Sequence, residues 1–202
     1  MERCMARETY HHGELRLALI DSARALLTEQ GIEAFSLREA ARRAGVSPAA
    51  PAYHFGDASG LLTAVAMQGF AELTQTLVAR AAGTRTPADK LQVLGRAYIQ
   101  FAFDHPALFH LMFRKDKLRI TDDLKTLAIA AFEPLQQAVC AAAGVNDISP
   151  ELLASMLAAW SMVHGFAHLA LDGQFERFSG TQSMEAFCDR YIPLAIAQLK
   201  IS

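Results

Sequence analysis

The chain has 202 residues, of which 52% are apolar and 20% charged, and its formal net charge is −2. This length allows one large domain or two small ones, and the near-neutral charge excludes a strong overall attraction to nucleic acid. The three cysteines have neither metal-ligand spacing nor the density of a disulfide scaffold, which fits reduced thiols in the cytoplasm. Alanine supplies much of the apolar content and no alternating strand pattern appears, so we predict an all-α fold.

The first part of the chain predicts three helices. The first helix is expected from about Glu14 to Gln30, with leucines on one face and Gly31 as its stop. Residues 36–55 then predict two short helices joined by a tight turn, a shape that fits a DNA major groove. Ser36 and Glu39 have the spacing of a capping box at the start of the first short helix.

The turn between the two short helices contains residues with separate expected roles. Gly45 can adopt a left-handed conformation after the last helical turn, and Val46 is expected to enter the core. Ser47 is expected to cap the next helix and Pro48 to occupy its first position, with Gly56 ending that helix. Any helical hairpin can carry this pattern, so the turn alone is weak support for DNA binding.

Six further helices are expected beyond this hairpin, which makes about nine in total. Asp57 is expected to cap a long helix that reaches about residue 82. The remaining helices are expected near 87–104, over a short segment around Leu108, and near 122–143, 150–172 and 183–199. The charged patch 114–119 is expected to be an exposed loop.

The stretch from Leu152 to Leu171 has no formal charge and is long enough to span a bilayer. It contains two histidines, its tryptophan lies in mid-segment, and its flanks Glu151 and Asp172 provide no basic anchor. We therefore expect a buried helix and no membrane insertion.

Two sets of motifs resemble one known family. The N-terminal third is similar to the DNA-binding domain of TetR-type transcription regulators, through Tyr10-His-His-Gly13, the run 35–48, His54-Phe55 and Leu61-Leu62. Trp160-Ser-Met-Val-His164-Gly165 resembles the W-x-x-x-H-G signature of one C-terminal class in that family, and His105-Pro106-x-Leu108-Phe109 also fits that class. The resemblance implies a helix-turn-helix DNA-binding domain over 1–56 and an effector-binding and dimerisation domain over 57–202.

The function that the resemblance implies is that of a cytoplasmic, homodimeric transcription regulator. A repressor is expected, released from a palindromic operator in double-stranded DNA by a small apolar or aromatic effector of unknown identity. Base contacts are expected from Ser47 and from alanine methyl groups, which can pack against thymine methyls, and aromatic and basic side chains suit phosphates. The expected DNA-binding residues are Tyr10, His11, His12, Arg38, Arg42, Ser47, Ala49, Ala50, Tyr53 and His54.

The C-terminal part offers candidates for an effector pocket, although an aromatic stripe is also typical of a plain core. His164 and His168 have the spacing of metal ligands, but no Glu or Cys joins them nearby, so no metal is expected. The last two helices have broad apolar faces that could pair two copies. The candidate pocket residues are Phe101, Phe109, Met112, Phe113, Phe132, Trp160 and His164.

Two positions depart from the family pattern, because Ala52 and Ala58 stand where a tyrosine and a lysine are usual. The first 60 residues also hold seven arginines against eight acidic residues. These features leave open a ligand-binding or interaction protein that kept the fold but lost DNA recognition. No catalytic triad, phosphate loop or carboxylate pair supports an enzyme, and no cofactor is expected.

Overall fold

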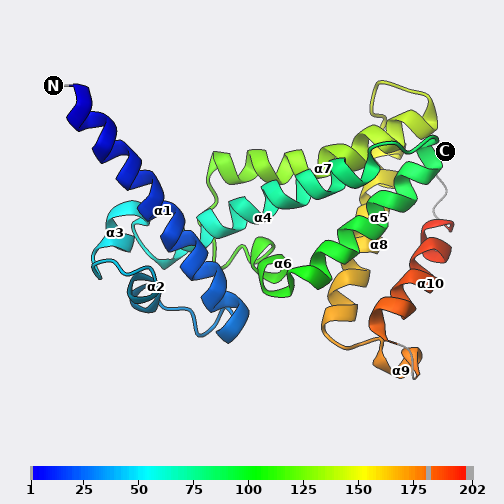
Figure 1. Cartoon of the computed structure of the whole chain (residues 1–202). Helices are drawn as coiled ribbons and strands as arrows, with labels where there is room; N and C mark the ends of the chain where they lie inside the picture. The colour runs from blue at the N-terminus through cyan, green and yellow to red at the C-terminus, as the bar shows by residue number, and fades with distance from the viewer. Residues whose placement is uncertain (1, 181–182, 199–202) are drawn as a thin grey trace. The chain divides into compact units, whose positions relative to one another are not determined.

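The computed structural model describes residues 2–180 and 183–198, with side chains described from residue 13 onward. All regular structure in these ranges is α-helical, which confirms the predicted class (Figure 1). The ten helices within them are α1 (Glu2–Gln30), α2 (Leu37–Arg43), α3 (Ala50–Phe55), α4 (Ala58–Ala81), α5 (Pro87–Asp104), α6 (Pro106–Met112), α7 (Asp122–Ala143), α8 (Pro150–Leu171), α9 (Glu176–Ser179) and α10 (Met184–Ile196).

The helix starts follow the local capping chemistry predicted from the sequence at most positions. The hydroxyls of Ser149 and Ser183 each accept a hydrogen bond from the amide three residues later, and Asp57 accepts one from the Gly60 amide at 2.8 Å. The start of α1 was predicted wrongly, because the helix begins at Glu2 and not near Glu14, and the short helix α9 was not predicted.

The start of α3 also differs from the prediction. Its N-cap is Ala49, and the Tyr53 amide donates to the Ala49 carbonyl at 3.1 Å. A helix capped by Ser47 would need its first backbone hydrogen bond from the amide of residue 51. Pro51 has no such amide, so the helix begins two residues later and the chain first makes a turn over residues 47–50.

The chain forms two compact units. The first comprises the residues up to Gly69 together with Pro106–Leu127, and the second comprises Phe70–His105 together with the residues from Ala128 onward. Helices α4 and α7 each run from one unit into the other (Figure 1). The predicted boundary between a DNA-binding domain over 1–56 and a C-terminal domain over 57–202 does not coincide with these units. It is a division by function, and it stays a prediction.

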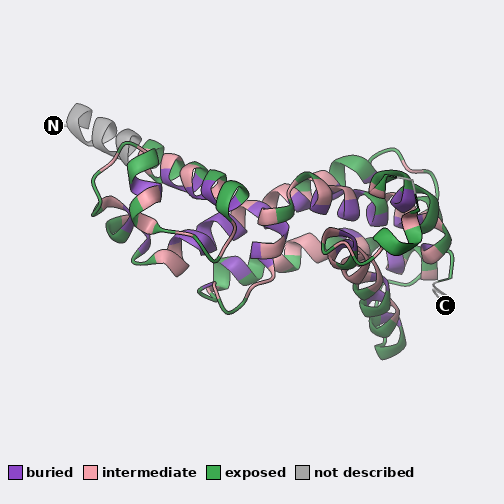
Figure 2. Cartoon of the chain, turned by 90° about the horizontal axis from the view of Figure 1, so that it is seen from below, coloured by how far each residue is buried: buried purple, intermediate pink, exposed green. Residues whose placement is uncertain are grey.

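In the first unit, α1 packs against α2 and α6, and the helices share one apolar core (Figure 2). Leu19, Leu26 and Leu27 of α1 are buried, as expected for its leucine face, but Leu15 and Val46 are only half-buried. The largest fully buried side chains of this unit are Leu19, Ile20, Leu26, Leu27, Leu61, Val65, Phe109 and Leu111.

In the second unit, α5 packs against both α8 and α10. Close approach requires Gly95, because a Cβ atom there would lie 2.5 Å from Ile196 Cδ1 and 3.3 Å from Val163 Cγ1. Pro193 lies inside α10 and cannot donate to the Asp189 carbonyl one turn earlier. The Arg96 guanidinium of α5 donates to that carbonyl at 3.1 Å, so the proline creates a docking point between the two helices.

The turn between α2 and α3 has the geometry of a Schellman motif. The Gly45 amide donates to the Arg42 carbonyl at 3.2 Å and the Val46 amide donates to the Ala41 carbonyl at 3.0 Å. Gly45 has φ +68°, the left-handed conformation in which a Cβ atom is unfavourable. The predicted role of Gly45 is therefore confirmed.

Replacing Gly45 by alanine is expected to lower the free energy of unfolding by about 1–2 kcal/mol. No atom lies within 4 Å of a Cβ built at Gly45, so the cost arises from the backbone conformation alone. Gly13→Ala is the matched control, since Gly13 is helical and also has open space around its Cβ position. Urea unfolding should show Gly13→Ala unchanged or more stable; equal stability of Gly45→Ala and the parent chain would contradict this account.

Candidate nucleic-acid interface and C-terminal pocket

Helix α2 begins with half of the predicted capping box. The Ser36 hydroxyl accepts a hydrogen bond from the Glu39 amide at 3.5 Å, as expected. The Glu39 carboxylate turns the other way and accepts two hydrogen bonds from Arg42, at 2.8 and 2.6 Å. The hydrogen bonds from Arg42 lower the pKa of Glu39 to about 2, so this carboxylate is charged at neutral pH.

The arginines of α2 differ in what they can offer a ligand. Arg43 donates to Glu29 of α1 at 2.6 Å and its side chain is 26% exposed, so it holds α2 against α1. Arg42 is 71% exposed despite its pairing with Glu39, and Arg38 is exposed at the start of the helix. Positive charge on the surface of α2 is therefore concentrated at Arg38 and Arg42.

Helix α3 and the turn before it have an exposed side made of small residues and one aromatic ring. Ser47, Ala49 and Ala52 are exposed, and Tyr53 is 79% exposed. Ala50 and His54 are half-buried, and the Tyr53 and His54 rings meet edge to face at a centroid distance of 5.2 Å. The side chains of the other three predicted DNA contacts, Tyr10, His11 and His12, lie outside the described residues.

The buried side of α3 is fixed by its last residue. Phe55 is 6% exposed, and the Arg16 guanidinium of α1 lies 5.2 Å from the centre of its ring. A guanidinium over an aromatic face is attracted by the negative charge of that face. This contact holds α3 against α1 and leaves the opposite side of α3 free to meet a ligand.

The charged patch 114–119, expected to be an exposed loop, lies in the loop between α6 and α7 and is exposed at Lys115, Asp116 and Arg119, but part of it is packed. Leu118 is 7% exposed, and the Arg119 amide donates to the buried hydroxyl of Thr63 at 2.8 Å. The Arg119 guanidinium pairs with Asp57 at 3.0 Å, and Lys117 pairs with Glu33 at 2.6 Å. The loop thus joins the α1–α2 connection to the start of α4, and the lone Leu118 among its charges was the sequence signal for this packing.

The second unit contains an aromatic and histidine cluster on α5, α7 and α8. Tyr98 and His164 are hydrogen bonded between the Tyr98 hydroxyl and His164 Nδ1 at 2.8 Å. The His164 ring lies 5.5 Å from Trp160 and 4.5 Å from His168, and Phe132 meets Trp160 edge to face at 6.0 Å. Burial, with a smaller effect from the charge of His168, lowers the pKa of His164 to about 4.

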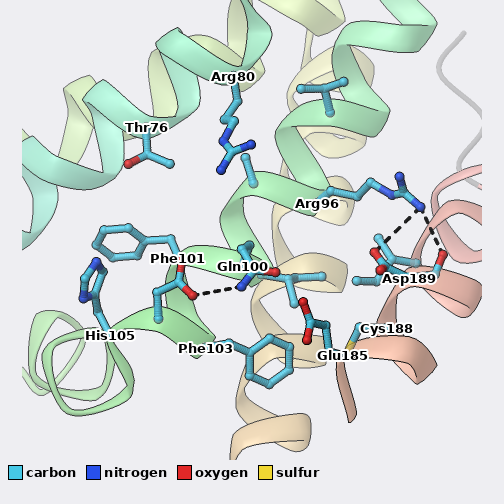
Figure 3. Close-up of a pocket in the computed structure, with 15 residues that line it drawn as sticks. Thr76, Arg80, Arg96, Gln100, Phe101, Phe103, His105, Glu185, Cys188 and Asp189 are labelled. Carbon is cyan, nitrogen blue, oxygen red and sulfur yellow. Dashed lines mark hydrogen bonds and ion pairs between the residues drawn. The ribbon is translucent and has the colours of Figure 1, made fainter. Parts of the chain in front are cut away.

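A pocket of about 510 Å³ lies elsewhere in the same unit, between α4, α5 and α10 (Figure 3). Of the seven predicted pocket residues, only Phe101 lines it, and its ring meets the His105 ring at a centroid distance of 5.0 Å. Phe132, Trp160 and His164 belong to the aromatic cluster. Phe109, Met112 and Phe113 belong to the first unit, so the structure does not gather all seven around this pocket.

The pocket is lined by both charged and apolar side chains. Arg96 pairs with Asp189 at 3.9 Å, and Gln100 donates to Asp104 at 2.9 Å. Arg80 on α4 and Glu185 on α10 also line it (Figure 3). No sequence pattern indicated this pocket, because its charged residues come from three separate helices without a shared spacing.

A helix-turn-helix followed by a larger helical part with a pocket is typical of transcription regulators that carry the DNA-binding part and the effector-binding part in one chain. The family model described as "Bacterial regulatory proteins, tetR family" matches residues 19–65. The model described as "Tetracyclin repressor-like, C-terminal domain" matches residues 91–193. The chain belongs to the TetR family, whose members are DNA-binding transcriptional regulators and not enzymes.

Individual relatives agree with this assignment. Over 81 residues the chain is 36% identical to the HTH-type transcriptional regulator BetI of Rhizobium meliloti (strain 1021), and the match spans 40% of each protein. A solved structure of a protein of unknown function from Rhodococcus sp. RHA1 is 30% identical with a TM-score of 0.77, over 94% of this chain and 97% of that one. PfmR, a TetR family regulator from Thermus thermophilus, shares the fold at 22% identity, with a TM-score of 0.63 over 90% and 98% of the chains.

The neutral state of His164 is expected to make the protein less stable in mild acid. Its folded pKa of about 4 lies below the ordinary 6.5, so the unfolded chain binds the proton more readily between these values. The free energy of unfolding is therefore unaffected by His164 above about pH 6.5. It decreases as the pH falls towards 4, because the unfolded chain takes up a proton that the folded chain does not. Urea unfolding at about pH 7.5 and about pH 5 should show a smaller acid loss in His164→Gln than in the parent chain. An equal loss in both would assign the acid sensitivity to other groups.

Proposed function

We propose that the chain is a cytoplasmic, homodimeric repressor that releases its operator when a small molecule binds the second unit. The observation that carries this proposal is the first unit, where α2 and the buried side of α3 are tied to α1 while the other side of α3 stays exposed. A six-residue helix cannot stand alone, so holding it rigidly with one side free suits a groove-reading element.

The proposed DNA contacts fall into two groups. Arg38 and Arg42 on α2, with Tyr53 and His54, bind phosphates and fix the position of the hairpin on the duplex. Ser47, Ala49 and Ala50 approach the base edges. Tyr10, His11 and His12 complete the phosphate contacts in this proposal.

The DNA-binding proposal is tested with a duplex from the region upstream of the chain's own gene. Arg42→Ala and Tyr53→Ala should each weaken binding about three- to tenfold on every sequence, and Arg42→Ala should reduce the slope of log K against log salt by about one. Arg85→Ala removes one exposed positive charge from the other compact unit and serves as the control. Fluorescence anisotropy measures the affinities, and unchanged binding in both variants would contradict the placement of the hairpin.

The proposed dimer uses α8 and α10. Leu153 and Leu157 are four residues apart on one face of α8 and are exposed, and Tyr191 and Leu194 are exposed on α10. Among the described helices, α8 is the one with the length and apolar content to cross a membrane. Only 28% of its apolar stretch is buried within the chain. A second copy of these two helices would cover the exposed leucines, so we assign this apolar face to dimerisation and not to a bilayer.

The dimer is tested by placing charge on that face. Leu157→Glu combined with Leu194→Glu is expected to convert the dimer to monomers, because burying two uncompensated carboxylates per protomer opposes association. Ile129→Glu is the control, as Ile129 on α7 is the most exposed isoleucine among the described residues and lies outside the proposed face. Light scattering after size-exclusion chromatography gives the mass; a monomeric parent chain, or a dimer that survives the double substitution, would refute this interface.

The proposed effector binds in the second unit. The aromatic cluster supports the apolar or aromatic ligand predicted from the sequence, together with assignment to the W-x-x-x-H-G class through Trp160, His164 and Gly165. The separate pocket between α4, α5 and α10 has Arg80 and Glu185 on its walls, which supports a ligand that also carries a polar or charged group.

A second candidate function is a ligand-binding protein of the same fold that no longer recognises DNA. Ala52 and Ala58 favour it, because both lack the polar group with which a longer side chain would reach a phosphate. The same anisotropy titration separates the two functions, since only the repressor binds its upstream duplex in a salt-sensitive way.

A further inference from the structure

The segment that would face the base edges lacks the side chains with which proteins read three of the four bases. Residues 44–56 contain no Arg, Lys, Asn, Gln, Asp or Glu. Arginine and lysine read guanine through two acceptors, asparagine and glutamine read adenine, and carboxylates accept from cytosine. The segment therefore cannot make any of the paired hydrogen bonds that give strong base discrimination.

The polar groups that the segment does contain discriminate weakly. The exposed Ser47 hydroxyl can donate or accept, so it serves more than one base. The His54 ring is half-buried and lies edge to face with Tyr53, which restricts its reach. Tyr53 is large and 79% exposed, and its hydroxyl suits a phosphate at the groove edge.

The remaining exposed side chains of the segment are aliphatic. Pro48, Ala49 and Ala52 are all exposed, and Ala49 and Ala52 are three residues apart, so their methyl groups lie on the same side of α3. Because alanine is short, the backbone of α3 can approach the bases closely. Thymine C5-methyl is the apolar group that base edges present in the major groove.

We propose that Ala49 and Ala52 are specificity-determining residues that pack against thymine methyl groups, so that thymines at defined positions specify each operator half-site. This inference rests on the proposed DNA-binding function and adds the chemical feature of the DNA that is read. Each contact buries about one methyl group, so each thymine contributes a modest discrimination of about three- to fivefold.

The test removes single methyl groups from the DNA. The bound duplex is first found by selection from a random library, and each thymine is then replaced in turn by deoxyuridine, which keeps base pairing but lacks the C5-methyl. Anisotropy titrations should show a loss of affinity of about three- to fivefold at two thymines of each half-site. The remaining thymines should tolerate replacement.

The protein side of the contact is tested with Ala49→Gly and Ala52→Gly. Glycine is well tolerated at an N-cap, so Ala49→Gly should keep the fold, and circular dichroism checks both variants. Each variant should lose the penalty for deoxyuridine at one thymine while keeping it at the other, which is the signature of a direct contact in a double-mutant cycle. The matched control is Ala34→Gly, an exposed alanine outside the segment, which should keep both penalties.

Three results would overturn the inference. Sequence-specific binding without any deoxyuridine penalty would remove the methyl contact and leave the proposed repressor intact. A penalty that persists in both glycine variants would assign the thymine contact to other residues. Failure to bind any duplex specifically and in a salt-sensitive way would refute the proposed function and this inference together.

Discussion

The candidate interface depends on one backbone constraint, the left-handed conformation of Gly45. That residue lets the amides of Gly45 and Val46 close the end of α2 and reverses the chain before α3. Since α3 has only six residues, its own hydrogen bonds cannot keep it helical, and its direction is set by the turn before it and by Phe55 at its end. A different conformation at residue 45 would therefore move every side chain assigned to the groove.

Electrostatics support this arrangement through local pairing and not through net charge. Arg43 is engaged by Glu29 and Glu39, and Arg42 shares the Glu39 carboxylate. What stays available for phosphate is a small number of guanidinium groups at defined positions. Long-range attraction therefore contributes little to the proposed repressor, whose affinity would depend on the fit of the hairpin to the duplex and on doubling that fit in the proposed dimer.

The features that could be predicted from the sequence are those determined within a few residues. The helix starts at Ser149 and Ser183 and the turn at Gly45 follow from local hydrogen bonding, and they were found in the structure. The start of α3 was missed because the absent amide of Pro51 outweighs the capping preference of Ser47. The burial of Leu118 in the 113–121 loop had a sequence signal, but the partners of that loop and the pocket around Phe101 could not be predicted, because both arise from residues far apart in the chain.

The two helices that run through both units offer a route from effector to operator in the proposed repressor. Within the first unit, α4 begins at the Asp57–Arg119 pair, and the loop before α7 ends in the hydrogen bond from Arg119 to Thr63. The same loop reaches Glu33 beside α2 through Lys117. A ligand changes DNA binding only as far as it prefers one of two arrangements of these helices. In the proposed repressor, these contacts would pass a shift at the start of α4 or in the loop before α7 to Asp57, next to α3, and to Glu33, before α2.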